Sequence, residues 1–168
     1  MWYATGWFAK SSVPTPRIRA AERRRAGAGE AAVVTVAGRH PPVSRVRVVQ
    51  VVRGVLAGER ARVAMSVTFV GPTRIRQLNA RWKHADRTTD VLAFSLPLPD
   101  GGRQGDVYIC RAMAAGEAKK RGIAVGEELV RLVIHGTLHV LGYDHPEGDG
   151  RVRSTMWRRQ ERYLACLG

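Results

Sequence analysis

The stretch LVRLVIHGTLHVLGYDH, residues 129 to 145, is the most informative in the chain, because an apolar run here carries regularly spaced histidines and ends near a glycine. We predict a helix from Glu127 to Leu141, at the centre of the domain. His135 and His139 are four residues apart, which on a helix means about 40° around the axis and about 6 Å along it. Gly142 can adopt the left-handed conformation that ends a helix. The chain can then turn back, so that His145 reaches the same point as the other two imidazoles.

This spacing predicts a metal site. Three nitrogen ligands without an obvious fourth are typical of catalytic zinc, whose open position holds a water that the metal acidifies to a pKa of about 7. The expected chemistry is hydrolysis, with His135, His139 and His145 as ligands. The alternative is that histidines on an apolar helix face are core residues or caps. Three of the five histidines fall within eleven positions at ligand spacing, which favours the metal site, whereas His40 and His84 lie outside it.

The length and composition indicate one domain with a basic surface. The chain has 168 residues, 45% of them hydrophobic, and a net charge of +14. Residues 43 to 168 alone hold 21 basic and 12 acidic side chains. Strong positive charge attracts polyanions, so RNA or DNA is the expected partner. Of the 28 basic residues 24 are arginine, a bias that a GC-rich genome would also produce.

Residues 1 to 42 are expected to lie outside the fold. They are rich in Ala, Gly, Pro and Arg, show no sustained apolar periodicity, and end in HPP. We predict a disordered or misassigned N-terminal extension, although an organelle transit peptide has a similar arginine-rich composition. The domain then comprises residues 43 to 168.

The sequence favours a cytoplasmic protein without a membrane span. It contains no apolar run of 18 or more residues, and its first residues lack the pattern of a secretory signal. Cys110 and Cys166 are too few and too far apart for a disulfide framework or a cysteine metal motif.

The order of expected elements predicts an α+β fold. Strands are expected in ARVAMSVTFVG, TDVLAFSL and GDVYIC, the last two as a hairpin or as neighbours in a sheet. Helices are expected around them; their approximate ranges are 46–56, 73–82, 111–121, 127–141 and 151–168. The result is a single domain with a small mixed sheet packed against helices, whose central helix carries the histidines.

HGTLHVLGYDH, TDVLAF and GDVYIC together resemble the YbeY family of zinc-dependent endoribonucleases, over about residues 46 to 166. The family string HGxLHLxGYDH is met at every fixed position except Val140, where leucine is usual. The resemblance implies one zinc ion per chain on the three histidines and single-stranded RNA as substrate. It also implies a role in rRNA maturation, including the 3′ end of small-subunit rRNA, and in ribosome quality control. The ribosome or its small subunit is then a partner.

The family's arginine before the TDVL strand corresponds to Lys83 here, flanked by Arg81 and Arg87. Lysine keeps the charge but loses the bidentate fork of arginine. We expect Lys83 to contact the phosphate, with Arg81 and Arg87 as further substrate contacts; the alternative is an exposed lysine at a helix end. Asp144 neighbours His145 and is expected either to orient a ligand or to cap a backbone turn.

Three functions compete on these residues. A metal-dependent ribonuclease is favoured, with the 2′-hydroxyl or a water as nucleophile. A zinc hydrolase of another substrate is less favoured, because Gly136 stands where HExxH peptidases carry their glutamate base. A ribosome assembly factor with a mainly structural zinc would bind RNA equally well. The sequence leaves the general base, the physiological metal and the oligomeric state open.

Overall fold

The structure is a computed structural model that describes residues 33–38, 43–98, 103–146 and 148–168. The expectation of disorder for residues 1 to 32 lies outside this part of the chain. Among the described residues, no helix has both the length and the apolar character needed to cross a membrane.

Four strands form one mixed sheet in the order β1-β2-β4-β3. The strands are β1 (Val34–Ala37), β2 (Ala64–Val70), β3 (Val91–Pro97) and β4 (Arg103–Cys110). β1 and β4 run parallel to β2 on its two sides, and β3 pairs antiparallel with β4. The predicted pairing of the TDVLAFSL and GDVYIC strands is therefore confirmed.

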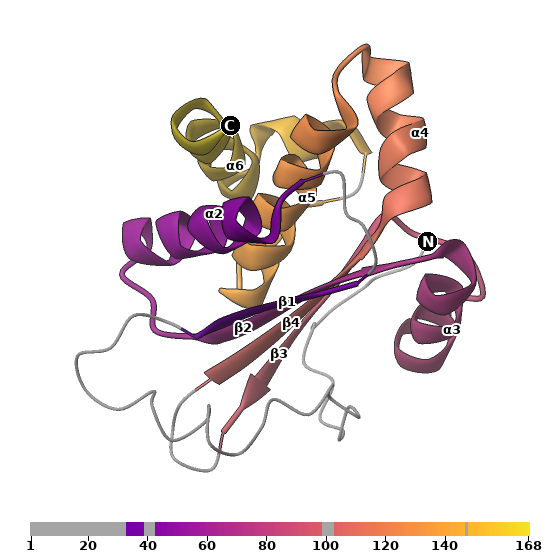
Figure 1. The fold of residues 1–168 in the computed structure, drawn as a ribbon, viewed down its shortest axis with the longest axis horizontal. Coiled ribbons are helices and arrows are strands. Elements are labelled where there is room, and N and C mark those ends of the chain that lie inside the picture. Colours follow the sequence, from indigo (N-terminus) through magenta and orange to yellow (C-terminus); the bar gives the residue numbers. More distant parts are fainter. Residues whose placement is uncertain (1–32, 39–42, 99–102, 147) are drawn as a thin grey trace.

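Helices cover both faces of the sheet (Figure 1). They are α2 (Arg45–Gly58), α3 (Pro72–Lys83), α4 (Arg111–Arg121), α5 (Val125–Val140) and α6 (Thr155–Leu167), with a 3-10 helix η1 (Gly148–Arg153) before the last. α5 is central, because it contacts α2, α4, α6, β3 and β4. The predicted α+β domain, with a small mixed sheet and a central histidine-bearing helix, is confirmed.

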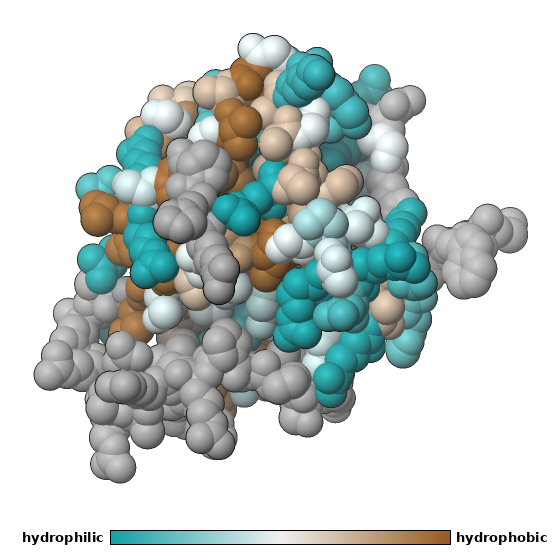
Figure 2. Space-filling view, turned by 45° about the vertical axis from the view of Figure 1, so that its right-hand side comes forward, coloured by the Kyte–Doolittle hydropathy of each residue, from teal (hydrophilic) through white to brown (hydrophobic). Residues whose placement is uncertain are grey.

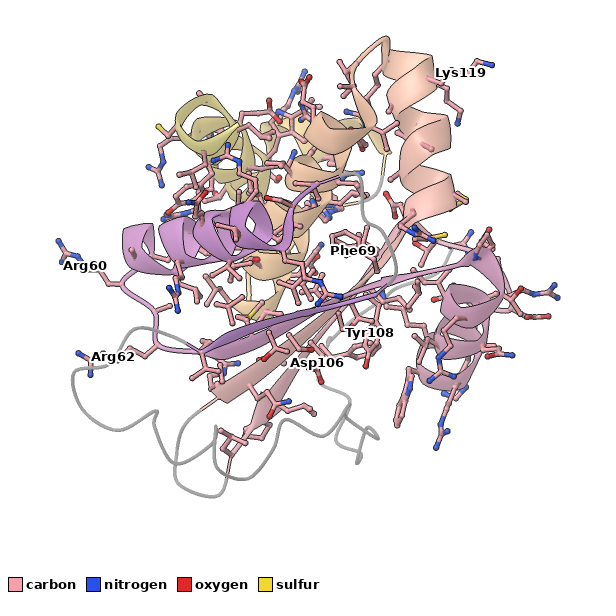
Figure 3. All side chains as sticks on the ribbon, in the orientation of Figure 1. Arg60, Arg62, Phe69, Asp106, Tyr108 and Lys119 are labelled. Carbon is pink, nitrogen blue, oxygen red and sulfur yellow. The ribbon has the colours of Figure 1, made fainter. Side chains whose placement is uncertain are left out.

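The two faces of the sheet bury two separate clusters of side chains. Met65, Val67 and Phe69 alternate along β2 and pack with α2 and α5 in the larger cluster. Tyr108 on β4 packs with α3 in the smaller cluster. Figure 3 shows Phe69 directed toward the α2 side of the sheet and Tyr108 toward the other. The larger cluster therefore determines the side of the sheet on which α5, the helix with the histidines, packs.

Small residues let α5 lie close to the sheet. A Cβ on Gly136 would lie 2.5 Å from Cγ1 of Val107, and a Cβ on Gly105 would lie 2.3 Å from Cγ1 of Val140. Real Cβ atoms do not approach other carbons so closely. These two glycines thus set the distance between the histidine helix and β4.

Two segments differ from the sequence-based expectation. Val34–Ala37 lies within the segment that we placed outside the fold, yet it pairs with Met65 to Thr68 of β2, so the expectation is wrong for these residues. Four residues are too few to show a periodicity, and pairing with β2 supplies the order. The last helix begins at Thr155 rather than at Arg151, because the Ser154 side chain accepts a hydrogen bond from the Trp157 amide and caps it.

Candidate metal centre

Three imidazole rings converge where α5 ends. His135 and His139 lie on consecutive turns of α5, with their Nε2 atoms 3.0 Å apart. Nε2 of His145 lies 3.4 Å from Nε2 of His135. Gly142, with φ of +91°, makes this return possible. Its amide donates to the carbonyl of His139, and the next amide donates to the carbonyl of Leu138, a Schellman ending.

The spacing of the ring nitrogens fits one shared metal ion. Two nitrogens bound tetrahedrally to zinc at 2.0–2.1 Å are about 3.3 Å apart. The observed separations of 3.0 and 3.4 Å lie on either side of that value. These three histidines form the group of potential ligands found in the described part of the chain, and they could hold a metal ion.

Gln160 of α6 orients the first histidine. Its Oε1 lies 2.8 Å from Nδ1 of His135, and both side chains are buried. The Gln160 amide nitrogen donates to Glu161, which fixes the carbonyl oxygen toward the ring. Nδ1 of His135 must therefore carry the proton, and Nε2 presents its lone pair to the other two rings.

The other two rings are held by the turn after α5. Nδ1 of His145 lies 3.1 Å from the carbonyl oxygen of Pro146, which can only accept, so Nδ1 is the donor and Nε2 of His145 faces the other two rings. Oδ1 of Asp144 accepts a hydrogen bond from the His145 amide at 2.8 Å and lies 4.0 Å from Nδ1 of His139. Asp144 thus caps the backbone beside the site, and its role in orienting a ligand stays a prediction.

Burial keeps the imidazoles of His135 and His139 neutral. Desolvation, with the nearby charge of His139 as the next cause, lowers the pKa of His135 to about 3. Desolvation, with the charges of His145 and then Lys83, lowers the pKa of His139 to about 4. Metal binding requires neutral imidazoles, so His135 and His139 are in the state that a metal would require at neutral pH.

The three cations predicted to contact the substrate lie in the last turn of α3 (Arg81 and Lys83) or just beyond that helix (Arg87). Lys83 is the last residue of that helix, it is exposed, and its charge lowers the pKa of His139, so its ammonium group acts on the histidine cluster. The Arg81 guanidinium carbon lies 5.1 Å from the centroid of Trp82. Arg87 is exposed. No hydrogen bond or ring contact within the described chain joins Arg81 or Arg87 to a histidine, so the substrate roles of these cations stay predictions.

A tyrosine between two of the histidines is tied to distant elements. The Tyr143 hydroxyl donates to Oε2 of Glu59 at 2.7 Å, just beyond the end of α2. Glu59 also accepts from the Tyr163 hydroxyl at 2.6 Å and from Arg159 at 2.7 and 2.9 Å, both on α6. Burial opposes ionisation of Glu59, but these hydrogen bonds outweigh it and lower the pKa of its carboxyl. The carboxylate therefore links the turn that carries His145 to α2 and α6.

Sequence reasoning missed Glu59 and Gln160. A signal for Gln160 existed, since it lies between Met156 and Tyr163 on the buried face of α6, where a polar residue needs a partner. Glu59 carried no such signal, because it follows a helix end and its partners lie 84 to 104 residues away.

By its architecture and its histidine cluster, the protein is an α+β domain with a three-histidine site that could hold a metal ion. The family described as "Endoribonuclease YbeY" matches residues 42–168. The chain belongs to the YbeY family, which confirms the resemblance.

Individual relatives agree with this assignment. An endoribonuclease YbeY of Anaeromyxobacter sp. (strain Fw109-5) is 48% identical over 88 residues, 51% of this chain and 46% of the relative. That of Aquifex aeolicus is 36% identical over 104 residues, 61% of this chain and 68% of the relative. The chain thus spans about half the length of some curated relatives that it matches. The solution structure of TM1509 from Thermotoga maritima covers 80% of this chain and 89% of its own, with a TM-score of 0.54 and 26% identity.

Proposed function

We propose that this protein is a metal-dependent endoribonuclease that cleaves single-stranded RNA. The observation that carries the proposal is the convergence of three imidazole Nε2 atoms at separations that suit one metal ion. The name of the matched family supports RNA as the substrate. We further propose that the ion is zinc, one per chain, on His135, His139 and His145.

The chain's own residues supply the rest of the site. A bound zinc would polarise a phosphodiester oxygen and acidify a water. Gln160 keeps the lone pair of His135 directed inward, and the turn from Gly142 to Pro146 holds His145. The Lys83 ammonium group would stabilise negative charge on the phosphate. Its effect on the pKa of His139 supports this position.

The surface of α3 suits a nucleic-acid partner. The helix carries Arg74, Arg76, Arg81 and Lys83 and no acidic residue. Figure 2 shows hydrophilic side chains gathered over this helix. We propose that rRNA is the substrate, including the 3′ end of small-subunit rRNA, and that the protein acts in the cytoplasm with the ribosome in rRNA maturation and quality control.

The geometry disfavours a peptidase. HExxH peptidases carry a glutamate base directly after the first histidine, and here that position is Gly136. A Cβ at this position would lie 2.5 Å from Val107, so no larger side chain fits. The base of that mechanism is excluded both by identity and by space.

The test is cleavage of an end-labelled single-stranded RNA by the purified protein, beside His139→Ala and the matched control His84→Ala. His84 is an exposed histidine outside the cluster. We expect cleavage by the wild type and by His84→Ala, and none by His139→Ala with an unchanged circular dichroism spectrum. Equal cleavage by all three would contradict the proposal. RNA binding without cleavage by any of them would favour an assembly factor with a structural metal.

A further inference from the structure

Arg151 of η1 is a cation that lacks a carboxylate partner in the described structure. Its Nε is buried and has no hydrogen-bond acceptor. Other half-buried arginines nearby are paired through NH1: Arg131 with Glu161 at 2.8 Å and Arg159 with Glu59 at 2.7 Å. A guanidinium that is partly desolvated and unpaired costs free energy unless an anion binds it. Binding of an anionic ligand would therefore offset the cost of burying the Arg151 guanidinium.

Trp157 holds this guanidinium in place. The Arg151 guanidinium carbon lies 5.9 Å from the centroid of the Trp157 ring. Ser154 joins the two residues, since its hydroxyl donates to the Arg151 carbonyl at 2.7 Å and accepts from the Trp157 amide at 3.1 Å. Stacking uses the face of a guanidinium, while its N–H donors lie in the plane. Nε is buried, but the two terminal nitrogens are not among the buried unpartnered atoms, so these two remain available for a bidentate contact with a phosphate.

The pair lies beside the histidine cluster. η1 begins three residues after His145, and Trp157 lies one helical turn before Gln160, which bonds His135. The charge of Arg151 contributes to the lowered pKa of both His135 and His139. Lys83 approaches the same cluster from the end of α3. Two cations from different elements therefore act on one site.

We propose that Arg151 binds a phosphodiester group of the single-stranded RNA substrate next to the metal centre, with Trp157 as its positioning residue. The inference rests on the proposed function, because it takes the histidine cluster as the place where RNA is cut. It adds a second phosphate contact on the α6 side, which sequence comparison with the family motif does not indicate.

The test measures binding separately from cleavage. The probe is a fluorescent single-stranded 2′-O-methyl RNA of about 12 nucleotides, which lacks a 2′-hydroxyl nucleophile, and a denaturing gel after each titration checks that water has not cleaved it. Arg151→Gln is compared with Arg153→Gln, an exposed arginine of the same 3-10 helix. We expect Arg151→Gln to weaken binding about 10-fold and to lower the slope of log K against log salt by about 0.7, with bound metal unchanged. Arg153→Gln should change affinity less than about twofold.

Two further variants test the role of Trp157. Trp157→Phe keeps an aromatic face and should bind like the wild type, whereas Trp157→Leu should weaken binding as Arg151→Gln does. Equal losses for Arg151→Gln and Arg153→Gln, or no loss for either, would overturn the proposal. These binding results stand whether or not the wild type cleaves unmodified RNA. If Arg151→Gln does not fold, Arg151→Lys replaces it, and wild-type affinity in that variant would overturn the bidentate contact.

Discussion

At the residue scale, the orientation of His135 depends on one neutral amide. Oε1 of Gln160 accepts a hydrogen bond from Nδ1 of His135, so the lone pair of Nε2 is available to a metal. Hydrogen-bond partners of this kind raise the basicity of the ligand and fix its ring. The candidate metal centre therefore extends beyond the three histidines into α6.

Replacing Gln160 by leucine should weaken metal binding. The variant keeps a similar volume at a buried position but leaves the Nδ1 proton of His135 without an acceptor. We expect about a 10- to 100-fold loss of zinc affinity, measured by competition with a chelating dye. Gln160→Glu keeps an acceptor and should bind zinc at least as tightly as the wild type. Unchanged affinity in Gln160→Leu would show that the ring is held by other contacts.

A methyl group on Gly136 should destabilise the fold. The new Cβ would meet Cγ1 of the buried Val107 at 2.5 Å, and such overpacking costs about 1–3 kcal/mol. The matched control is Gly116→Ala in α4, which meets nothing within 4 Å and should gain up to about 1 kcal/mol. Urea unfolding measures both. Adding Val107→Ala should recover part of the loss in Gly136→Ala; a purely additive double variant would argue against the clash.

At the element scale, Glu59 connects three parts of the chain that lie far apart in sequence. Its carboxylate receives hydrogen bonds from the turn after α5 and from α6, while it stands beyond the end of α2. α2 and α6 therefore support the histidine cluster without supplying one of its histidines.

Glu59→Ala should lower the free energy of unfolding by about 2–3 kcal/mol, because it removes hydrogen bonds to a charged group that is only 7% exposed. Asp86→Ala is the control, since the Asp86–Arg76 ion pair is exposed and should contribute little. Thermal and urea unfolding compare the two variants. If both lose the same stability, the Glu59 network has no special structural role.

β1 should contribute to stability although it lies in a segment expected to be outside the fold. Val34 and Val36 pack against the main core, and β1 pairs with β2. A chain that begins at residue 43 should be less stable than one that begins at residue 33, by about 2 kcal/mol. Equal urea midpoints for the two chains would mean that β1 adds no net stability.

At the scale of the whole molecule, the buried histidines make the stability of the metal-free protein depend on pH. The pKa values of about 3 for His135 and about 4 for His139 lie below the ordinary value of 6.5. Below pH 6.5 the unfolded chain therefore binds protons that the folded chain does not, and stability is lost as pH falls.

Between pH 7.5 and 5.5, the chelator-treated protein should lose about 2–3 kcal/mol of unfolding free energy. Urea unfolding across this range measures the loss. A variant with glutamine at both positions, His135→Gln with His139→Gln, should show a flatter profile. The same slope in wild type and variant would assign the pH dependence to other groups.

The convergence of the three histidines and much of the fold followed from local sequence alone. The four-residue spacing of His135 and His139 and the glycine after the helix are rules of backbone geometry, so the sequence determined that these rings converge. TDVLAFSL and GDVYIC, short apolar segments on either side of a glycine-rich turn, likewise predicted a strand pair, which the register of β3 and β4 confirms.

Tertiary structure alone decided what surrounds the histidines. Gln160 meets His135 across 25 residues, and Arg159 meets Glu59 across 100. The four residues of β1 show no periodicity of their own. They form a strand because their backbone pairs with the edge of β2. Local patterns record only what the backbone does within a few residues, whereas the partners of a buried polar group depend on how whole elements pack.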